Sequence, residues 1–143
     1  MAAALAIGAG FAGAYAGHAS AARAATVRAA GSPLGRIVVD GSGHTLYLFE
    51  KDKRGRSACF GPCATVWPPL MTSGKATAGT GAKASMVGVI RRAGGSHQVT
   101  YNGHPLYRYA GDTRPGQTNG EGLRDYGAGW YVVAPSGKKI DRD

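Results

Sequence analysis

Two pairs of side chains in this sequence have the types and the spacing of a polar site. Tyr47 is followed five positions later by Asp52, and Tyr107 is followed in the same way by Asp112. A carboxylate at the start of a loop accepts hydrogen bonds from the next backbone amides, and a buried tyrosine needs a partner for its hydroxyl. We therefore expect each tyrosine to bond to the loop of its own segment and to fix the turn there. Ligand binding by these four residues is the alternative.

The two cysteines, Cys59 and Cys63, have three residues between them. In an exported protein such a pair usually forms a disulfide, and here it would pin the turn before Trp67. The alternative is metal or redox chemistry, because Cys-x3-Cys with a distant histidine resembles the soft-ligand pattern of copper chaperones, and thiolates suit Cu(I). Those chaperones have a thioredoxin-like α/β fold, which this sequence does not predict. We therefore predict a disulfide, with no metal and no cofactor.

Other metal ligands are sparse. Beyond the N-terminal leader there are three histidines: His44, His97 and His104. A metal site needs converging ligands, and the spacing of His97 and His104 along one hairpin places them about 13 Å apart. Four oxygen-bearing side chains punctuate a Gly-rich loop: Asp112, Asn119, Glu121 and Asp125. Their spacing does not match an EF-hand calcium loop.

Recognised catalytic motifs are absent from the sequence. It has no Gly-x-Ser-x-Gly, no phosphate-cradling loop, no His-Glu-x-x-His and no close carboxylate pair, and so offers no acid and base to assign. We therefore predict a protein that is not an enzyme, with a wall-modifying hydrolase as the weakest alternative.

The Tyr and Asp pairs belong to an internal repeat. Residues 38–55 and 99–116 share a Gly-containing turn followed by His-x-Leu-Tyr-x-aromatic-x-x-Asp, and such self-similarity indicates a repeat architecture. Asn102-Gly103 is a strong hairpin turn. Strand alternation places Leu46 and Leu48 on one face and Tyr47 and Phe49 on the other. Both faces are apolar, so we expect each hairpin to be covered on both sides.

These patterns predict an all-β fold: two tandem hairpin-based repeats that form a small sandwich or closed barrel. Further strands are expected at residues 87–91 and 96–101, joined by Gly94-Gly95, and at residues 130–134. We place repeat one at about 35–71, a loose inter-repeat loop at 72–85, and repeat two at about 86–134, within a single domain of residues 31–143.

Residues 1–30 resemble a signal peptide with a leader helix. The segment is rich in Ala and Gly, and both Ala19-Ser20-Ala21 and Ala22-Arg23-Ala24 satisfy the small-x-small rule for cleavage. No Lys or Arg precedes Arg23, and we expect the usual basic end to lie upstream of Met1. A membrane anchor is the alternative, but the apolar stretch is too short and too rich in Gly to span a bilayer. We therefore predict export and no membrane span in the mature chain.

The formal net charge of +9 favours attraction to acidic polymers, such as wall glycans or anionic lipid heads. The densest basic cluster is Lys51, Lys53, Arg54 and Arg56. Because no run of five or six basic residues occurs, nucleic-acid binding is not predicted.

The motifs together resemble a family of secreted bacterial tandem repeats with a Tyr-x4-Asp motif, described as lipoproteins of unknown function. The residues that carry the resemblance span about 35–134: Tyr47 to Asp52, Cys59-Phe60-Gly61-Pro62-Cys63, Trp67-Pro68-Pro69-Leu70, Val99-Thr100-Tyr101-Asn102-Gly103 and Tyr107 to Asp112. The chain lacks the lipid-attachment cysteine of many members. The resemblance implies a periplasmic or extracellular location and no particular activity.

Two functions therefore follow from the sequence. The first is an exported, non-enzymatic protein of the cell envelope or extracellular space that binds or scaffolds an unknown partner, such as an acidic polymer. The alternative is an extracytoplasmic protein that handles copper or haem.

Overall fold

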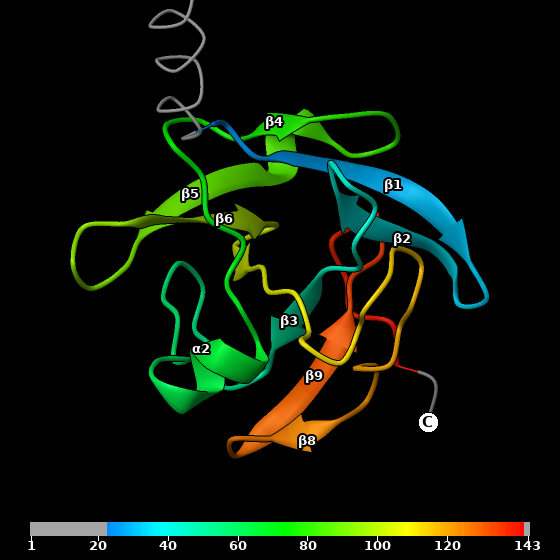
Figure 1. The fold of residues 1–143 in the computed structure, drawn as a ribbon. Helices are drawn as coiled ribbons and strands as arrows, with labels where there is room; N and C mark the ends of the chain where they lie inside the picture. Colours follow the sequence, from blue (N-terminus) through cyan, green and yellow to red (C-terminus); the bar gives the residue numbers. More distant parts are fainter. Residues whose placement is uncertain (1–22, 142–143) are drawn as a thin grey trace, which may run out of the picture.

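A computed structural model of the chain describes residues 23–141 (Figure 1). The predicted leader helix lies outside the described residues. The strands are β1 (Thr26–Ser32), β2 (Gly35–Asp40), β3 (Tyr47–Phe49), β4 (Thr77–Ala78), β5 (Val87–Arg91), β6 (His97–Tyr101), β7 (His104–Pro105), β8 (Arg124–Asp125) and β9 (Ala128–Val132). The described helices are both short: α2 (Pro62–Val66) and the 3₁₀ turn η1 (Ala84–Met86).

The strands form three small sheets with the orders β2-β1-β4, β3-β9-β8 and β5-β6-β7. Every pairing is antiparallel except that of β1 with β4. Figure 1 shows β1 and β2 on one side of the molecule, β5 and β6 on the other, and β3 with β9 and β8 between and below them. Within residues 23–141 the strands do not close into a barrel. The fold consists of three packed sheets and almost no helix, which confirms the predicted sandwich-like all-β class.

The predicted hairpins form where the turn residues allow them. Asn102 and Gly103 have φ of 51° and 79°, as a two-residue type I′ turn requires, and Tyr101 lies opposite His104 across it. Gly94 and Gly95 also have positive φ and join β5 to β6. Glycine takes this backbone conformation without strain, and asparagine tolerates it.

The two repeats are related by an approximate two-fold axis that passes between Tyr47 and Tyr107. These residues exchange backbone hydrogen bonds: the Tyr47 N–H donates to the Tyr107 carbonyl (2.8 Å) and the reverse bond is 3.0 Å. Matching bonds repeat on either side. Leu46 donates to Val38 in one repeat (3.1 Å), just as Leu106 donates to Val99 in the other (3.0 Å). The two repeats thus pair with each other through their backbones at Tyr47 and Tyr107 and form one unit.

Each hairpin is covered on both faces, as the strand alternation predicts. Leu46 and Leu48 enter one hydrophobic core with Val99 and Leu106. Tyr47 and Phe49 enter a second core on the opposite face. Burial on both faces explains why the short strand β3 has no charged side chain.

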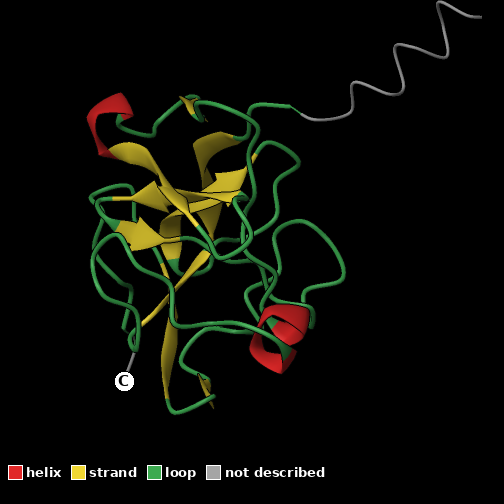
Figure 2. Ribbon diagram, turned by 90° about the vertical axis from the view of Figure 1, so that its left-hand side faces the viewer, coloured by secondary structure: helices red, strands yellow, loops and turns green. Residues whose placement is uncertain are grey.

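Two expectations need correction. β1 begins at Thr26 and buries Val27, so the folded part starts before the predicted leader boundary at residue 30. Its Ala-rich sequence resembles a leader, but the pairing with β2 stabilises it as a strand. The predicted loop 72–85 holds the strand β4, whose neighbour Gly79 donates to the Val27 carbonyl (2.7 Å). Figure 2 shows the strands gathered at the centre and α2 at one edge.

Candidate functional site

The motif pairs cross between the repeats. Tyr47 donates its hydroxyl hydrogen bond to Asp112 Oδ2 (2.6 Å), and Tyr107 donates to Asp52 Oδ2 (2.7 Å). The expectation that each tyrosine bonds to its own loop is therefore wrong. Because Tyr47 and Tyr107 pair with each other across the approximate two-fold axis, the side chain of each tyrosine points toward the loop of the other repeat. Each Tyr-Asp pair consequently ties the two repeats together.

A network of hydrogen bonds surrounds the Asp52 pair. Ser57 Oγ accepts from the Cys59 amide (3.1 Å) and from Arg92 (2.8 Å), and it lies 2.6 Å from the Tyr107 hydroxyl. Since Ser57 already accepts twice, its own proton goes to Tyr107, whose proton goes to Asp52. Asp52 Oδ1 also accepts from the Ala58 amide (2.7 Å). The basic loop between Asp52 and Ser57 is thus closed at its base.

The Asp112 pair is held by backbone groups instead. The Gly120 amide donates to the Tyr47 hydroxyl (3.1 Å), and the Asn119 amide donates to Asp112 Oδ1 (2.8 Å). A side chain at Gly120 would overlap the rings of Trp67 and Tyr47, because a Cβ there would lie 2.7 and 3.0 Å from them. The glycine therefore allows the loop to approach the tyrosine closely.

A column of aromatic rings joins the two pairs. Trp67 stacks on Trp130 with ring centroids 4.0 Å apart, and the repeat-equivalent residues Phe49 and Tyr109 extend the stack at its two ends, at 4.0 and 4.3 Å. Tyr47 meets Trp67 edge to face, and Tyr107 meets Trp130 in the same way. These are the favoured geometries for aromatic pairs. The two tryptophans are fully buried, so the column forms the second core.

Burial shifts the titration of all four motif residues. It raises the pKa of Asp52 to about 6, although the Ala58 amide, the Tyr107 hydroxyl and the charge of Arg92 act in the opposite direction. Burial likewise raises the pKa of Asp112. The pKa values of the Tyr47 and Tyr107 hydroxyls rise well above the ordinary tyrosine value, mainly through burial and the neighbouring aspartates. Both tyrosines therefore stay protonated and act as donors.

Cys59 and Cys63 form the predicted disulfide, which closes a five-residue ring that leads into α2. Arg92 fixes this ring from outside by donating to the Cys59 carbonyl (2.6 Å) and to Gln98 (2.9 Å). Because the two sulfurs are bonded to each other, neither is a thiolate that could bind copper.

The histidines and the acidic side chains of the Gly-rich loop each contact different neighbours and do not converge on one point. His44 Nδ1 lies 2.9 Å from Ser42, whereas His104 is partly buried near Arg54, and this burial lowers its pKa. In the Gly-rich loop, Asp125 accepts from Trp67 Nε1 (3.3 Å) and Glu121 accepts from the Val132 amide (2.8 Å). In residues 23–141, no group of three or more His, Cys, Asp or Glu side chains could hold a metal ion.

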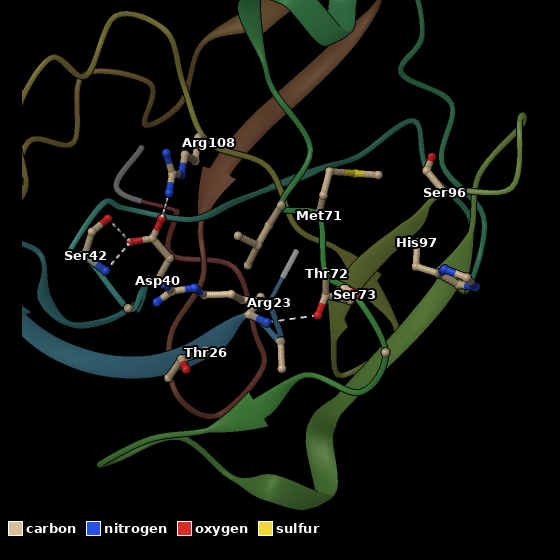
Figure 3. Close-up of a pocket in the computed structure, with 15 residues that line it drawn as sticks. Arg23, Thr26, Asp40, Ser42, Met71, Thr72, Ser73, Ser96, His97 and Arg108 are labelled. Atoms are coloured by element: carbon tan, nitrogen blue, oxygen red, sulfur yellow. Dashed lines mark hydrogen bonds and ion pairs between the residues drawn. The ribbon is translucent and has the colours of Figure 1, made fainter. Parts of the chain in front are cut away.

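Two cavities open at the surface. One of about 960 Å³ lies between β2 and β6 and is lined by Arg23, Asp40, Met71, His97 and Arg108. Figure 3 shows Ser42 and Arg108 directed at the buried Asp40, with His97 on the other side. Asp40 also accepts from the amides of Ser42 and His44 (3.0 Å each). Its contacts thus fix the turn between β2 and β3.

The other cavity, of about 410 Å³, reaches Asp52 and is lined by Glu50, His104, Lys138 and Lys139 among others. Glu50 and Lys139 form an ion pair across it (2.6 Å). Of the two motif carboxylates, Asp52 is thus the one that lines this cavity.

A family model described as a secreted repeat of unknown function matches the chain twice, over residues 29–71 and 88–134. The chain belongs to this family. The two matches coincide with the two halves related by the axis between Tyr47 and Tyr107. Neither a curated protein nor a solved structure matches the chain.

Membership of the secreted repeat family identifies the protein as exported. No helix among residues 23–141 is long and apolar enough to cross a membrane. The family description gives no activity, so the function has to be argued from the site.

Sequence analysis missed two members of the site, Ser57 and Arg92. Neither lies in the shared repeat pattern: Ser57 follows the basic loop of repeat one, and Arg92 comes from the β5–β6 turn. Ser57 has a weak signal, because it lies two residues before the cysteine pair that only repeat one contains, whereas Arg92 has none. The Tyr-x4-Asp spacing is identical in the two repeats. It therefore does not tell whether a tyrosine bonds to the aspartate of its own repeat or to that of the other.

Proposed function

We propose that this protein is a non-enzymatic binding module of the cell envelope or the extracellular space, and that its partner is an acidic polymer. The observation that carries this proposal is the distribution of charge. Both exposed carboxylates of the described chain, Glu50 and Asp141, lie within ion-pair distance of Lys139, at 2.6 and 3.5 Å. The remaining acids are buried or half-buried.

The cations are distributed differently. Most lysines and arginines of residues 23–141 are exposed, and they come from both loops and strands: Arg23, Arg36, Lys51, Lys53, Arg54, Arg56, Lys75, Lys83, Arg91, Arg114, Arg124, Lys138 and Lys139. The surface is therefore more strongly positive than the formal net charge of +9 alone conveys. A field of this sign attracts a polyanion and raises its rate of association.

The geometry of the motif supports a structural role and not catalysis. Tyr47 and Tyr107 are fully buried, and each is hydrogen-bonded to the aspartate of the other repeat. A catalytic group must reach the atoms of a substrate, which these hydroxyls do not. The repeated Tyr and Asp residues thus tie the two repeats together and leave the surface for binding.

Binding of fluorescent polygalacturonate to the exported protein, compared with neutral dextran of similar length, tests the proposal. We expect binding to polygalacturonate alone, and a large loss of affinity between about 20 mM and about 300 mM salt, because salt screens exposed charges. Failure to bind polygalacturonate or polyphosphate at low salt, or equal binding to dextran, would contradict the proposal.

A further inference from the structure

Two aromatic rings stand out at the surface near the disulfide. Phe60 is 48% exposed and Tyr126 is 43% exposed, whereas the other aromatic side chains of residues 23–141 are buried or half-buried. Phe60 is part of the disulfide ring, and Tyr126 lies at the turn between β8 and β9. Large exposed rings that are grouped mark an interaction site more often than single ones do.

Both rings are held in place by the fold. Phe60 is confined by the bond between Cys59 and Cys63. Tyr126 has φ of 58°, a left-handed conformation that is costly for a residue with a bulky side chain and that is retained mostly where it serves a function. Its hydroxyl donates to the Pro62 carbonyl (3.4 Å), which joins the β8–β9 turn to α2. Figures 1 and 2 both show these two segments at the same end of the molecule.

One cation lies over the Phe60 ring, and another lies near the turn that carries Tyr126. The Arg92 guanidinium carbon lies 4.6 Å from the centre of the Phe60 ring, and the Arg92 hydrogen bonds go to oxygens without formal charge on Ser57, Gln98 and Cys59. Lys51 Nζ is exposed and lies 3.8 Å from the position of a Cβ at Gly127, next to Tyr126. The adjacent acid, Asp125, directs its carboxylate inward to Trp67, and Asp52 is bonded to Tyr107.

We propose that Lys51, Phe60, Arg92 and Tyr126, here called the disulfide-end surface, bind an anionic polysaccharide. This inference rests on the proposed function and names the class of polymer and the place where it binds. The face of Phe60 that Arg92 does not cover and the exposed ring of Tyr126 offer flat apolar area for the C–H groups of sugar rings, while the two cations meet carboxylates or phosphates along the chain. The Tyr126 hydroxyl is already used by Pro62, so the ring contributes its face and not a hydrogen bond.

A polysaccharide fits this surface better than a lipid or a protein. A membrane anchor of this kind would need aliphatic residues around the rings to enter the acyl region, and the neighbours here are Gly61, Pro62 and Gly127. Rings that are anchored by a disulfide and by the bond from Tyr126 to Pro62 suit a stiff polymer with repeated sugar faces. The second repeat has no disulfide ring to carry an equivalent of Phe60, so the site is single.

The test compares variants for binding to polygalacturonate. Tyr126→Asn removes the ring and keeps a residue that tolerates positive φ, and Phe60→Ser removes the other ring. We expect the double variant F60S/Y126N to bind about tenfold more weakly and Lys51→Gln about threefold more weakly, an effect that salt removes. Matched controls are Val89→Ser on β5, which removes another exposed apolar side chain, and Lys75→Gln in the loop 72–85. Both controls should bind like the unchanged protein.

The outcomes separate this inference from the proposed function. If the unchanged protein binds polygalacturonate and F60S/Y126N binds equally well while its melting temperature stays the same, the disulfide-end surface is not the site, although the proposed function stands. Equal losses in Lys51→Gln and Lys75→Gln would likewise contradict the site, because they indicate diffuse charge attraction. Binding to phosphatidylglycerol vesicles that depends on Phe60 and Tyr126, without such dependence for polygalacturonate, would show a lipid surface instead. If the unchanged protein binds no acidic polymer, both proposals fail.

Discussion

The two Tyr-Asp pairs are equivalent in sequence and differ in what supports them. At one end of the aromatic column, the Tyr107 hydroxyl accepts from the side chain of Ser57, which Arg92 holds beside a disulfide. At the other end, the Tyr47 hydroxyl accepts from the backbone amide of Gly120 in a Gly-rich loop. Each aspartate also accepts from one backbone amide, that of Ala58 or that of Asn119. The shared pair therefore stabilises the fold, and the differing support determines what each end can do. The side-chain network can be altered by mutation one group at a time, whereas the backbone network cannot.

The comparison also shows where function is to be sought. At the Asp112 end, Gly120 packs closely against the rings of Trp67 and Tyr47, so the Tyr47–Asp112 pair is covered by the loop. The Asp52 end carries the disulfide ring, the exposed cations and the cavity of about 410 Å³. The two repeats therefore share a core, and they differ at the Asp52 end, which alone carries the disulfide.

Loss of Asp112 should be the most damaging change at either end. We expect Asp112→Ala to lower the free energy of unfolding by about 3 kcal/mol, because it leaves the buried Tyr47 hydroxyl without its acceptor. Asp52→Ala should cost about 1 kcal/mol less, since the Tyr107–Asp52 bond is only partly buried beside the cavity of about 410 Å³, from which water can replace the lost acceptor. Urea denaturation of the two variants measures both values, and equal losses would remove the distinction between the ends.

Reduction of the disulfide should loosen the Asp52 end selectively. The ring is short, so the chain-entropy model gives a loss of about 2 kcal/mol, which the variant Cys59→Ser/Cys63→Ser should reproduce. Amide hydrogen exchange should accelerate at Ala58 and Cys59 and stay unchanged at Asn119 and Gly120. Equal acceleration at both ends would show that the disulfide supports the whole fold and not one end.

Ser57→Ala should have a smaller effect, of about 1 kcal/mol. It removes the hydroxyl that links Arg92 to Tyr107, but leaves Tyr107 bonded to Asp52. Thermal unfolding compared with Thr113→Ala, an exposed hydroxyl in the other loop, provides the matched measurement. A loss no larger than that of the control would mean that Ser57 does not support the pair.

The smallest expected effect is a pH dependence of the free energy of unfolding that arises from Asp52. Burial raises its pKa from 3.8 to about 6, so the native state holds a proton that the unfolded chain releases. The contribution of this carboxyl to the free energy of unfolding therefore decreases as pH rises from about 4 to about 6. Asp52→Asn should flatten the stability curve in that window relative to the unchanged protein. An unchanged slope would contradict the assignment.

Local features of the fold were predictable from the sequence because their causes are local. The Asn102-Gly103 turn, the alternation of Leu46 and Tyr47 between two cores, and the disulfide each depend on residue types at short spacing. β1 was not recognised, because the Ala-rich residues around Val27 resemble a leader and become a strand only through β2 and β4.

The candidate site was predictable only in part. The sequence identifies Tyr47, Asp52, Tyr107 and Asp112, but not which of them are partners. An exact repeat gives the same spacing whether the pairs form within a repeat or across the axis. Packing decides between the two arrangements, through the backbone bonds that Tyr47 and Tyr107 exchange. The aromatic column likewise requires residues from both repeats, such as Trp67 and Trp130.

The crossed pairing itself can be measured by double-mutant cycles on the free energy of unfolding. Tyr47→Phe and Asp112→Asn, from different repeats, should show a coupling energy of about 1.5 kcal/mol. Tyr47→Phe and Asp52→Asn, from the same repeat, should be additive. Coupling in the second cycle and additivity in the first would contradict the exchange of pairs between the repeats.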